Sequence, residues 1–82
     1  MMTLQIVSPP DQVNPPRLSV VVPAYNEEEN ILPLATEIVA ALATLPGGFE
    51  LILVDDASTD TTARCIREIT LPQVRGVFHR IN

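Results

Sequence analysis

Two apolar runs, separated by a helical pattern, constrain the fold of this chain more than any other feature. The first, "LSVVVP", covers residues 18–23, and the second, "FELILVD", covers residues 49–55. Continuous β-branched and aliphatic runs of this length are typical of strands that are buried on both faces of a parallel sheet. Pro23 has no N–H to donate to a neighbouring strand, so we expect the first strand to end there.

The segment between the two runs has helical periodicity. Its apolar residues recur at spacings of three and four: Ile31, Leu34, Ile38, Leu42 and Leu45. Asn26 and Glu29 form a capping-box pattern, but a helix that began there would hold Pro33 in its interior. With Asn30 as the N-cap, Pro33 lies in the first turn, where its missing N–H is harmless. We therefore expect the helix to begin after Asn30 and to end at "LPGG" (residues 45–48), where a glycine can form a left-handed C-cap.

A second helix and a third strand follow. "ASTDTT", residues 57–62, offers several N-cap residues, and the pattern predicts a helix over residues 60–69, ended by "LPQ". "VRGVFHR", residues 74–80, begins the third strand. The crossovers are long enough for right-handed strand–helix–strand units. The sequence thus predicts an α/β fold with an open parallel sheet of three strands and two crossover helices.

The N-terminal residues 1–16 contain four prolines and predict a disordered, Pro-rich leader, so the folded part is expected over residues 17–82. No stretch approaches the roughly 18 apolar residues that a transmembrane helix needs, and the start lacks the pattern of a signal peptide. We therefore expect a cytoplasmic chain. A third strand that ends the chain would leave one sheet edge bare, which predicts self-association through that edge.

The charge balance excludes some partners. The net charge is −5, and all five basic residues are arginines. Nucleic acids and anionic membrane surfaces need a basic patch, so neither is expected as the main partner. Cys65 is the single cysteine, which excludes an intramolecular disulfide and a cysteine-clustered zinc site.

Polar residues follow the first two predicted strands, at the edge where ligands bind in open α/β sheets. The rim would carry Tyr25, Glu27, Asp55, Asp56 and Ser58. The chain has no glycine-rich phosphate loop and no lysine. Carboxylates accept hydrogen bonds from base N–H groups and ribose hydroxyls, and Tyr25 offers a flat apolar face. The rim therefore predicts a site for the nucleoside end of a nucleotide, and a diphosphate beside it would need a divalent cation to offset the carboxylates.

Several of these polar residues have a structural explanation as well. The helix macrodipole favours Glu28 and Glu29 near a helix start. Helix capping is the expected role of Ser58, Thr59 and Asp60. Either Asp55 or Asp56 could cap the turn that follows the second predicted strand. We expect Cys65 to be a small core residue and His79, which has no triad partner in view, to be structural or exposed.

Taken together, "LSVVVPAYNEEENILPL" and "FELILVDDASTDTTARCIREI" closely resemble the start of the family 2 glycosyltransferases. These have the GT-A fold and include the dolichyl- and undecaprenyl-phosphate sugar transferases. The resemblance implies that this chain forms an incomplete, Rossmann-like half of a GT-A domain. The whole enzyme would transfer a sugar from a UDP- or GDP-linked donor to an acceptor such as a polyprenyl phosphate, with Mg²⁺ or Mn²⁺ as cofactor. By matching position, the nucleoside pocket would be lined by Pro23, Ala24, Tyr25, Glu27 and one acid of Asp55 and Asp56.

The chain departs from the family pattern at several points. Ala57 replaces a frequent glycine, a mild change unless that position needs a positive φ, and Thr61-Thr62 replaces a common Gly-Thr. The D-x-D motif that holds the metal and the diphosphate does not occur in this chain, and the catalytic base is expected still later. We therefore expect no catalytic or metal-binding residue here, an inactive fragment, and membrane association only as part of a longer chain.

Two other functions compete with this one. The chain could be a non-catalytic module that binds nucleosides or docks on a protein partner. A phospho-receiver domain also places an acid pair after a strand such as "LILVDD", but it needs a further aspartate after its third strand and a later lysine. The chain has neither.

Overall fold

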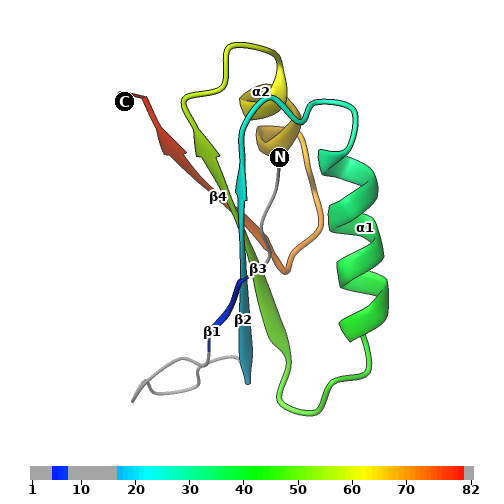
Figure 1. Cartoon of the computed structure of the whole chain (residues 1–82). Helices are drawn as coiled ribbons and strands as arrows, with labels where there is room; N and C mark the ends of the chain where they lie inside the picture. Colours follow the sequence, from blue (N-terminus) through cyan, green and yellow to red (C-terminus); the bar gives the residue numbers. More distant parts are fainter. Residues whose placement is uncertain (1–4, 8–16, 81–82) are drawn as a thin grey trace.

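The computed structural model describes residues 5–7 and 17–80, which form one open sheet with helices packed on it (Figure 1). The strands and helices are β1 (Gln5–Val7), β2 (Leu18–Ala24), α1 (Ile31–Leu42), β3 (Phe49–Asp56), α2 (Thr62–Arg67) and β4 (Val74–His79). The sheet order is β1-β2-β3-β4. β2, β3 and β4 pair in parallel, with Val20, Leu51 and Val74 side by side. The predicted fold class is confirmed.

The structure adds a strand that the sequence analysis did not anticipate. β1 pairs antiparallel with β2, so that Gln5 lies opposite Val21 and Val7 opposite Ser19. A strand of three residues gives too short an apolar pattern to be recognised in a segment rich in proline. Apart from β1, the leader predicted over residues 1–16 lies outside the described residues.

The helix boundaries agree with the prediction at one end and differ at the other. α1 begins after Asn30 as expected, and Pro33 lies in its first turn. It ends at Leu42, with Ala43 as a right-handed C-cap, so the expected glycine C-cap is wrong. Gly47 and Gly48 have φ values of 89° and 78°, but they turn the chain into β3 instead. α2 spans 62–67, shorter than the predicted 60–69. Within the described residues, neither helix is long and apolar enough to cross a membrane.

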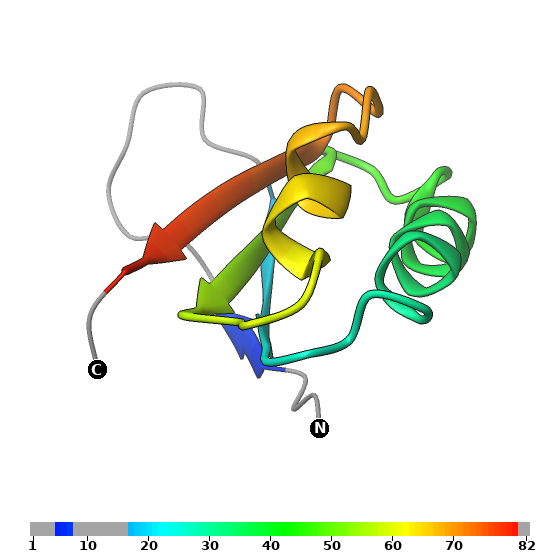
Figure 2. The ribbon, with the colours of Figure 1, turned by 90° about the horizontal axis from the view of Figure 1, so that it is seen from above.

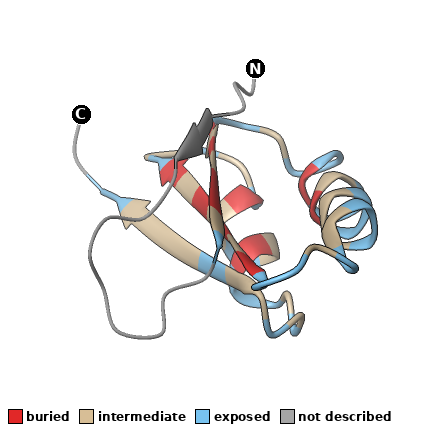
Figure 3. Cartoon of the chain, turned by 90° about the horizontal axis from the view of Figure 1, so that it is seen from below, coloured by how far each residue is buried: buried red, intermediate tan, exposed pale blue. Residues whose placement is uncertain are grey.

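Both helices cover the same face of the sheet (Figure 2). This face carries the alternate strand residues that point inward, and Figure 3 shows the buried positions gathered there. The core consists of Val20, Val22, Ala24, Ile31, Ala35, Leu51, Leu53 and Ile66. On the opposite face, Val21, Ile52 and Val54 are only half-buried. The composition of the two apolar runs predicted strands that are buried on both faces. In the structure, the face that the helices cover is buried, and the opposite face is largely half-buried.

Gly76 lets α2 lie directly on β4. A Cβ at this position would come within 2.7 Å of Ile66 Cγ2 and 2.8 Å of Phe78 Cζ, closer than real contacts allow. The close approach brings the C-terminal end of α2 over the end of β4, where the guanidinium carbon of Arg67 lies 4.4 Å from the centre of the Phe78 ring. The glycine thus shapes one wall of the pocket at the carboxyl edge of the sheet.

Candidate functional site

Asn26 fastens together the two loops that leave β2 and β3. Its side-chain Oδ1 accepts hydrogen bonds from the backbone N–H groups of Thr59 (2.8 Å) and Asp60 (3.3 Å). Its own N–H donates to Ser58 Oγ at 2.9 Å. Asn26 has a φ of 52°, in the left-handed region that asparagine tolerates better than most residues. These hydrogen bonds join the "YNEE" and "DASTD" segments, residues 25–28 and 56–60, into one unit, and we call the two segments the locked loops.

The glutamates after Asn26 reinforce this unit. The N–H of Glu27 donates to Thr62 Oγ1 at 2.8 Å. The Glu28 carboxylate accepts hydrogen bonds from the Thr61 hydroxyl (2.6 Å) and the Thr61 N–H (2.9 Å). These two bonds hold the pKa of Glu28 below its ordinary value. Glu28 thus stabilises the start of α2, a role that the macrodipole of its own helix does not explain.

Asp60 is the acceptor at the centre of the second loop. Its Oδ1 accepts from the N–H of Thr62 at 2.8 Å, and its Oδ2 accepts from the N–H of Glu28 at 3.4 Å. Desolvation raises the pKa of Asp60, but the hydrogen bonds that the carboxylate accepts, from Thr62 and from backbone N–H groups, together outweigh it, so the pKa is lowered overall. Asp60 was expected to cap the helix, but the N-cap residue of α2 is Thr61. Asp60 instead lies one position earlier and binds the N–H of Thr62, the first residue of α2.

Ala57 occupies a backbone conformation that favours glycine. Its φ is 57°, in the left-handed region where a Cβ is strained. The replacement of the family's frequent glycine at this position is therefore not mild. The strained residue lies directly after the two aspartates, where the chain turns from β3 into the locked loop.

The two adjacent aspartates have different environments. Asp55 is 4% exposed and lies between its register partners Ala24 on β2 and Phe78 on β4. Within the described residues, its carboxylate accepts no hydrogen bond, and its Oδ1 is fully buried. Asp56 is exposed, and its Oδ1 lies 3.7 Å from His79 Nδ1. A buried carboxylate without hydrogen bonds is costly for folding and is therefore a candidate for a ligand contact.

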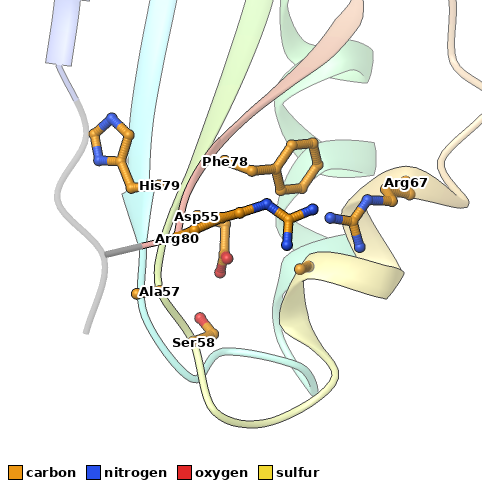
Figure 4. A pocket seen from close by; sticks show the side chains of 8 residues that line it. Asp55, Ala57, Ser58, Arg67, Phe78, His79 and Arg80 are labelled. Carbon is orange, nitrogen blue, oxygen red and sulfur yellow. The ribbon is translucent and has the colours of Figure 1, made fainter. Parts of the chain in front are cut away.

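A pocket of about 300 Å³ opens beside Asp55 (Figure 4). This volume is at the lower end of the range for small-molecule sites. The pocket is lined by Asp55, Ala57, Ser58, Ala63, Arg67, Phe78, His79 and Arg80. Among the rim residues expected at the nucleoside site, Asp55 and Ser58 line this pocket. Within residues 5–7 and 17–80, no three histidine, cysteine or acidic side chains form a group that could hold a metal ion.

The other predicted site residues lie around the same edge of the sheet. Ala24 is buried in the core at 1% exposure, and Pro23 is half-buried in β2. Tyr25 is 45% exposed. The Glu27 side chain accepts a hydrogen bond from Asn30 Nδ2 at 3.3 Å. None of these four is among the residues that line the described pocket beside Asp55.

The pocket also contains residues that the sequence analysis did not single out as ligands. Phe78, His79 and Arg80 lie at the carboxyl end of β4, and extending the rim to the third predicted strand would have found them. Arg67 has no such sequence signal, because its place depends on how α2 is rotated and how closely it approaches Gly76.

Comparison with known proteins agrees with this architecture. The chain is 50% identical over 52 residues to the dodecaprenyl-phosphate galacturonate synthase of Rhizobium johnstonii, which covers 63% of this chain and 15% of that protein. It is 43% identical over 52 residues to the undecaprenyl-phosphate 4-deoxy-4-formamido-L-arabinose transferase of Klebsiella pneumoniae, covering 63% of this chain and 16% of the relative. The enzyme of the same name from Photorhabdus laumondii is 46% identical over 50 residues, with 61% and 15% covered.

These matches span about one sixth of the relatives' length. No solved structure matches the chain significantly. The sequence profile of glycosyl transferase family 2 matches residues 19–82, which include β2 apart from Leu18, both helices, β3 and β4. This chain belongs to glycosyl transferase family 2.

Proposed function

We propose that this chain is the nucleoside-binding, N-terminal part of a transferase that moves a sugar from a nucleoside diphosphate donor to a polyprenyl phosphate. Family membership and the names of the relatives support the reaction class. The observation that carries the binding site is Asp55, a buried carboxylate at the carboxyl edge of the sheet that accepts no hydrogen bond from the residues that the structure describes. A ring N–H of the base or a ribose hydroxyl would supply the missing donor.

The rest of the nucleoside site would come from the neighbouring loop. The exposed ring of Tyr25 is available to cover the base or the ribose. The entrance to the nucleoside site, between β2 and the locked loops, would be formed by Pro23, Ala24 and Glu27. Mg²⁺ or Mn²⁺ would act in the complete enzyme, and we propose that residues beyond this chain supply the metal ligands and the catalytic base, so that the chain alone is inactive.

Calorimetric titration of the chain with UDP and GDP tests the binding site. Asp55→Asn keeps the shape of the side chain but replaces one acceptor oxygen by a donor. We expect about a tenfold or larger loss of affinity, since a hydrogen bond to a charged group contributes about 1.5–3 kcal/mol. The matched control is Asp56→Asn, which alters the exposed neighbour that lies beside His79. Thermal melts of both variants establish that they fold.

Two results would contradict the assignment. If affinity survives Asp55→Asn and falls with Asp56→Asn, the contact belongs to Asp56. If neither variant binds differently from the parent chain, the nucleoside site lies elsewhere. A chain that binds no nucleotide at all would favour the alternative of a protein-interaction module.

We further propose that the chain self-associates through β4. Within the described residues, β4 pairs with β3 on one side and with no strand on the other. An unpaired strand edge can pair with a second chain. Sedimentation should show dimers or larger species at micromolar concentration, whereas a compact monomer throughout would refute the proposal.

A further inference from the structure

A second pocket, of about 290 Å³, lies where the first turn of α1 meets α2, and we call it the helix groove. Figure 2 shows the two helices next to each other on the same face of the sheet. The apolar part of the groove lining consists of Leu32, Pro33, Cys65 and Ile69. The groove shares no described lining residue with the pocket beside Asp55, so the two sites are separate.

Leu32 borders the helix groove and is 52% exposed. The packing of α1 on the sheet does not use this side chain, because Ile31 and Ala35 fill the buried face of the helix and are both at 0% exposure. A single exposed leucine is ordinary on a protein surface. Here, however, Leu32 lies beside three other apolar lining residues, and together they form a surface that a partner can cover.

The rim of the helix groove is acidic. The remaining lining residues are Glu28, Glu29 and Glu68, and no basic residue is among the described lining. The hydrogen bonds from Thr61 lower the pKa of Glu28, so its carboxylate is charged at neutral pH. Glu68 lies 4.0 Å from Arg64, but both side chains are largely exposed, and such surface pairs contribute little. Within residues 5–7 and 17–80, Glu29 forms no ion pair.

An apolar floor inside an acidic rim selects a ligand that carries an apolar group flanked by positive charge. Anionic lipids and nucleic acids are repelled by the rim. A polyamine has the charge but no branched apolar group for the floor. A peptide with a leucine-like side chain beside lysine or arginine has both, and the aliphatic stems of the cationic residues can cover Leu32 as well.

We propose that the helix groove binds a segment of a partner protein in which apolar side chains are flanked by lysine or arginine residues. The apolar side chains fill the groove beside Leu32, and the cations reach Glu29 and Glu68 at its rim. This interaction surface is separate from the nucleoside site and does not depend on it.

The test is a titration of the ¹⁵N-labelled chain with a short synthetic peptide in which two leucines are flanked by lysines, followed by NMR. We expect the backbone N–H signals of residues 28–32 and 64–69 to shift, because these segments border the groove. Leu32→Ser should weaken peptide binding about tenfold, since it removes apolar surface that the leucines of the peptide cover. Glu29→Gln should weaken binding about two- to fivefold and reduce its dependence on salt concentration.

Glu37→Gln is the matched control for charge, because Glu37 is an exposed residue of α1 outside the groove lining. It should leave the affinity unchanged, and thermal melts would verify folding of all variants. A second peptide, in which serines replace the leucines, keeps the charge and should bind at least about tenfold more weakly.

Three results would overturn the proposal. Equal affinity for the two peptides would mean that the apolar floor plays no part. Equal losses with Glu29→Gln and Glu37→Gln would mean that the peptide is attracted only by the net negative charge of the chain. Signals that shift around other residues, or no shifts at millimolar peptide, would place no peptide in the helix groove.

Discussion

Replacing Ala57 by glycine should stabilise the chain, which is unusual for this substitution. Ala57 has a φ of 57°, and the left-handed conformation costs a residue with a Cβ about 1–2 kcal/mol. Glycine avoids this cost but loses about 0.4–1 kcal/mol more backbone freedom on folding. The difference is a gain of about 1 kcal/mol, which corresponds to a rise in Tm of about 4–8 °C for a domain of this size.

The matched control is Ala40→Gly. Ala40 is an exposed residue within α1, where glycine lowers stability by about 0.5–1 kcal/mol relative to alanine. The two substitutions remove the same methyl group but should change Tm in opposite directions in thermal unfolding followed by circular dichroism. If Ala57→Gly lowers Tm as Ala40→Gly does, then Ala57 is not held in the left-handed region and the argument about this turn is wrong.

Two further predictions concern the locked loops. Asn26→Ala should lower the free energy of unfolding by about 2 kcal/mol in chemical denaturation, because it removes the acceptor for two backbone N–H groups and leaves alanine at a φ of 52°. The stability of Asn26→Gly should lie between that of Asn26→Ala and that of the parent chain. Equal stability of all three proteins would refute the role of the side chain. The second prediction is that Tm falls as the pH drops from about 5 to about 3, because the folded-state pKa values of Glu28 and Asp60 are lowered. The stabilisation by these two carboxylates is complete above their pKa in the unfolded state and is lost as the pH falls through their pKa in the folded state. Glu28→Gln should therefore flatten the plot of Tm against pH. An unchanged plot would count against the Thr61 contact.

Residue patterns predicted the parallel sheet and the start of α1, because both depend on local periodicity and on the special backbone of proline. They did less well at helix ends. α1 ends at Leu42 although glycines follow later, and α2 begins only at Thr62, since the Asp60 side chain binds the Thr62 N–H before the helix starts. β1 was missed because a three-residue strand exists only through its pairing with β2.

The sequence by itself determined the fold class, the family, and the edge of the sheet where polar residues gather. The two continuous apolar runs, the helical spacing between them and the polar motifs that follow the runs can be recognised in the sequence without knowledge of any tertiary contact. Only the tertiary structure decided how the aspartates differ: Asp55 faces the helices and is buried, whereas Asp56 lies in the next position, on the opposite side of the strand, and is exposed. It also decided that Asn26 joins the two loops and that Arg67 reaches the pocket. These features depend on distances between segments that are about 30 residues apart in sequence, and such distances are set by packing and strand register, which local patterns do not encode.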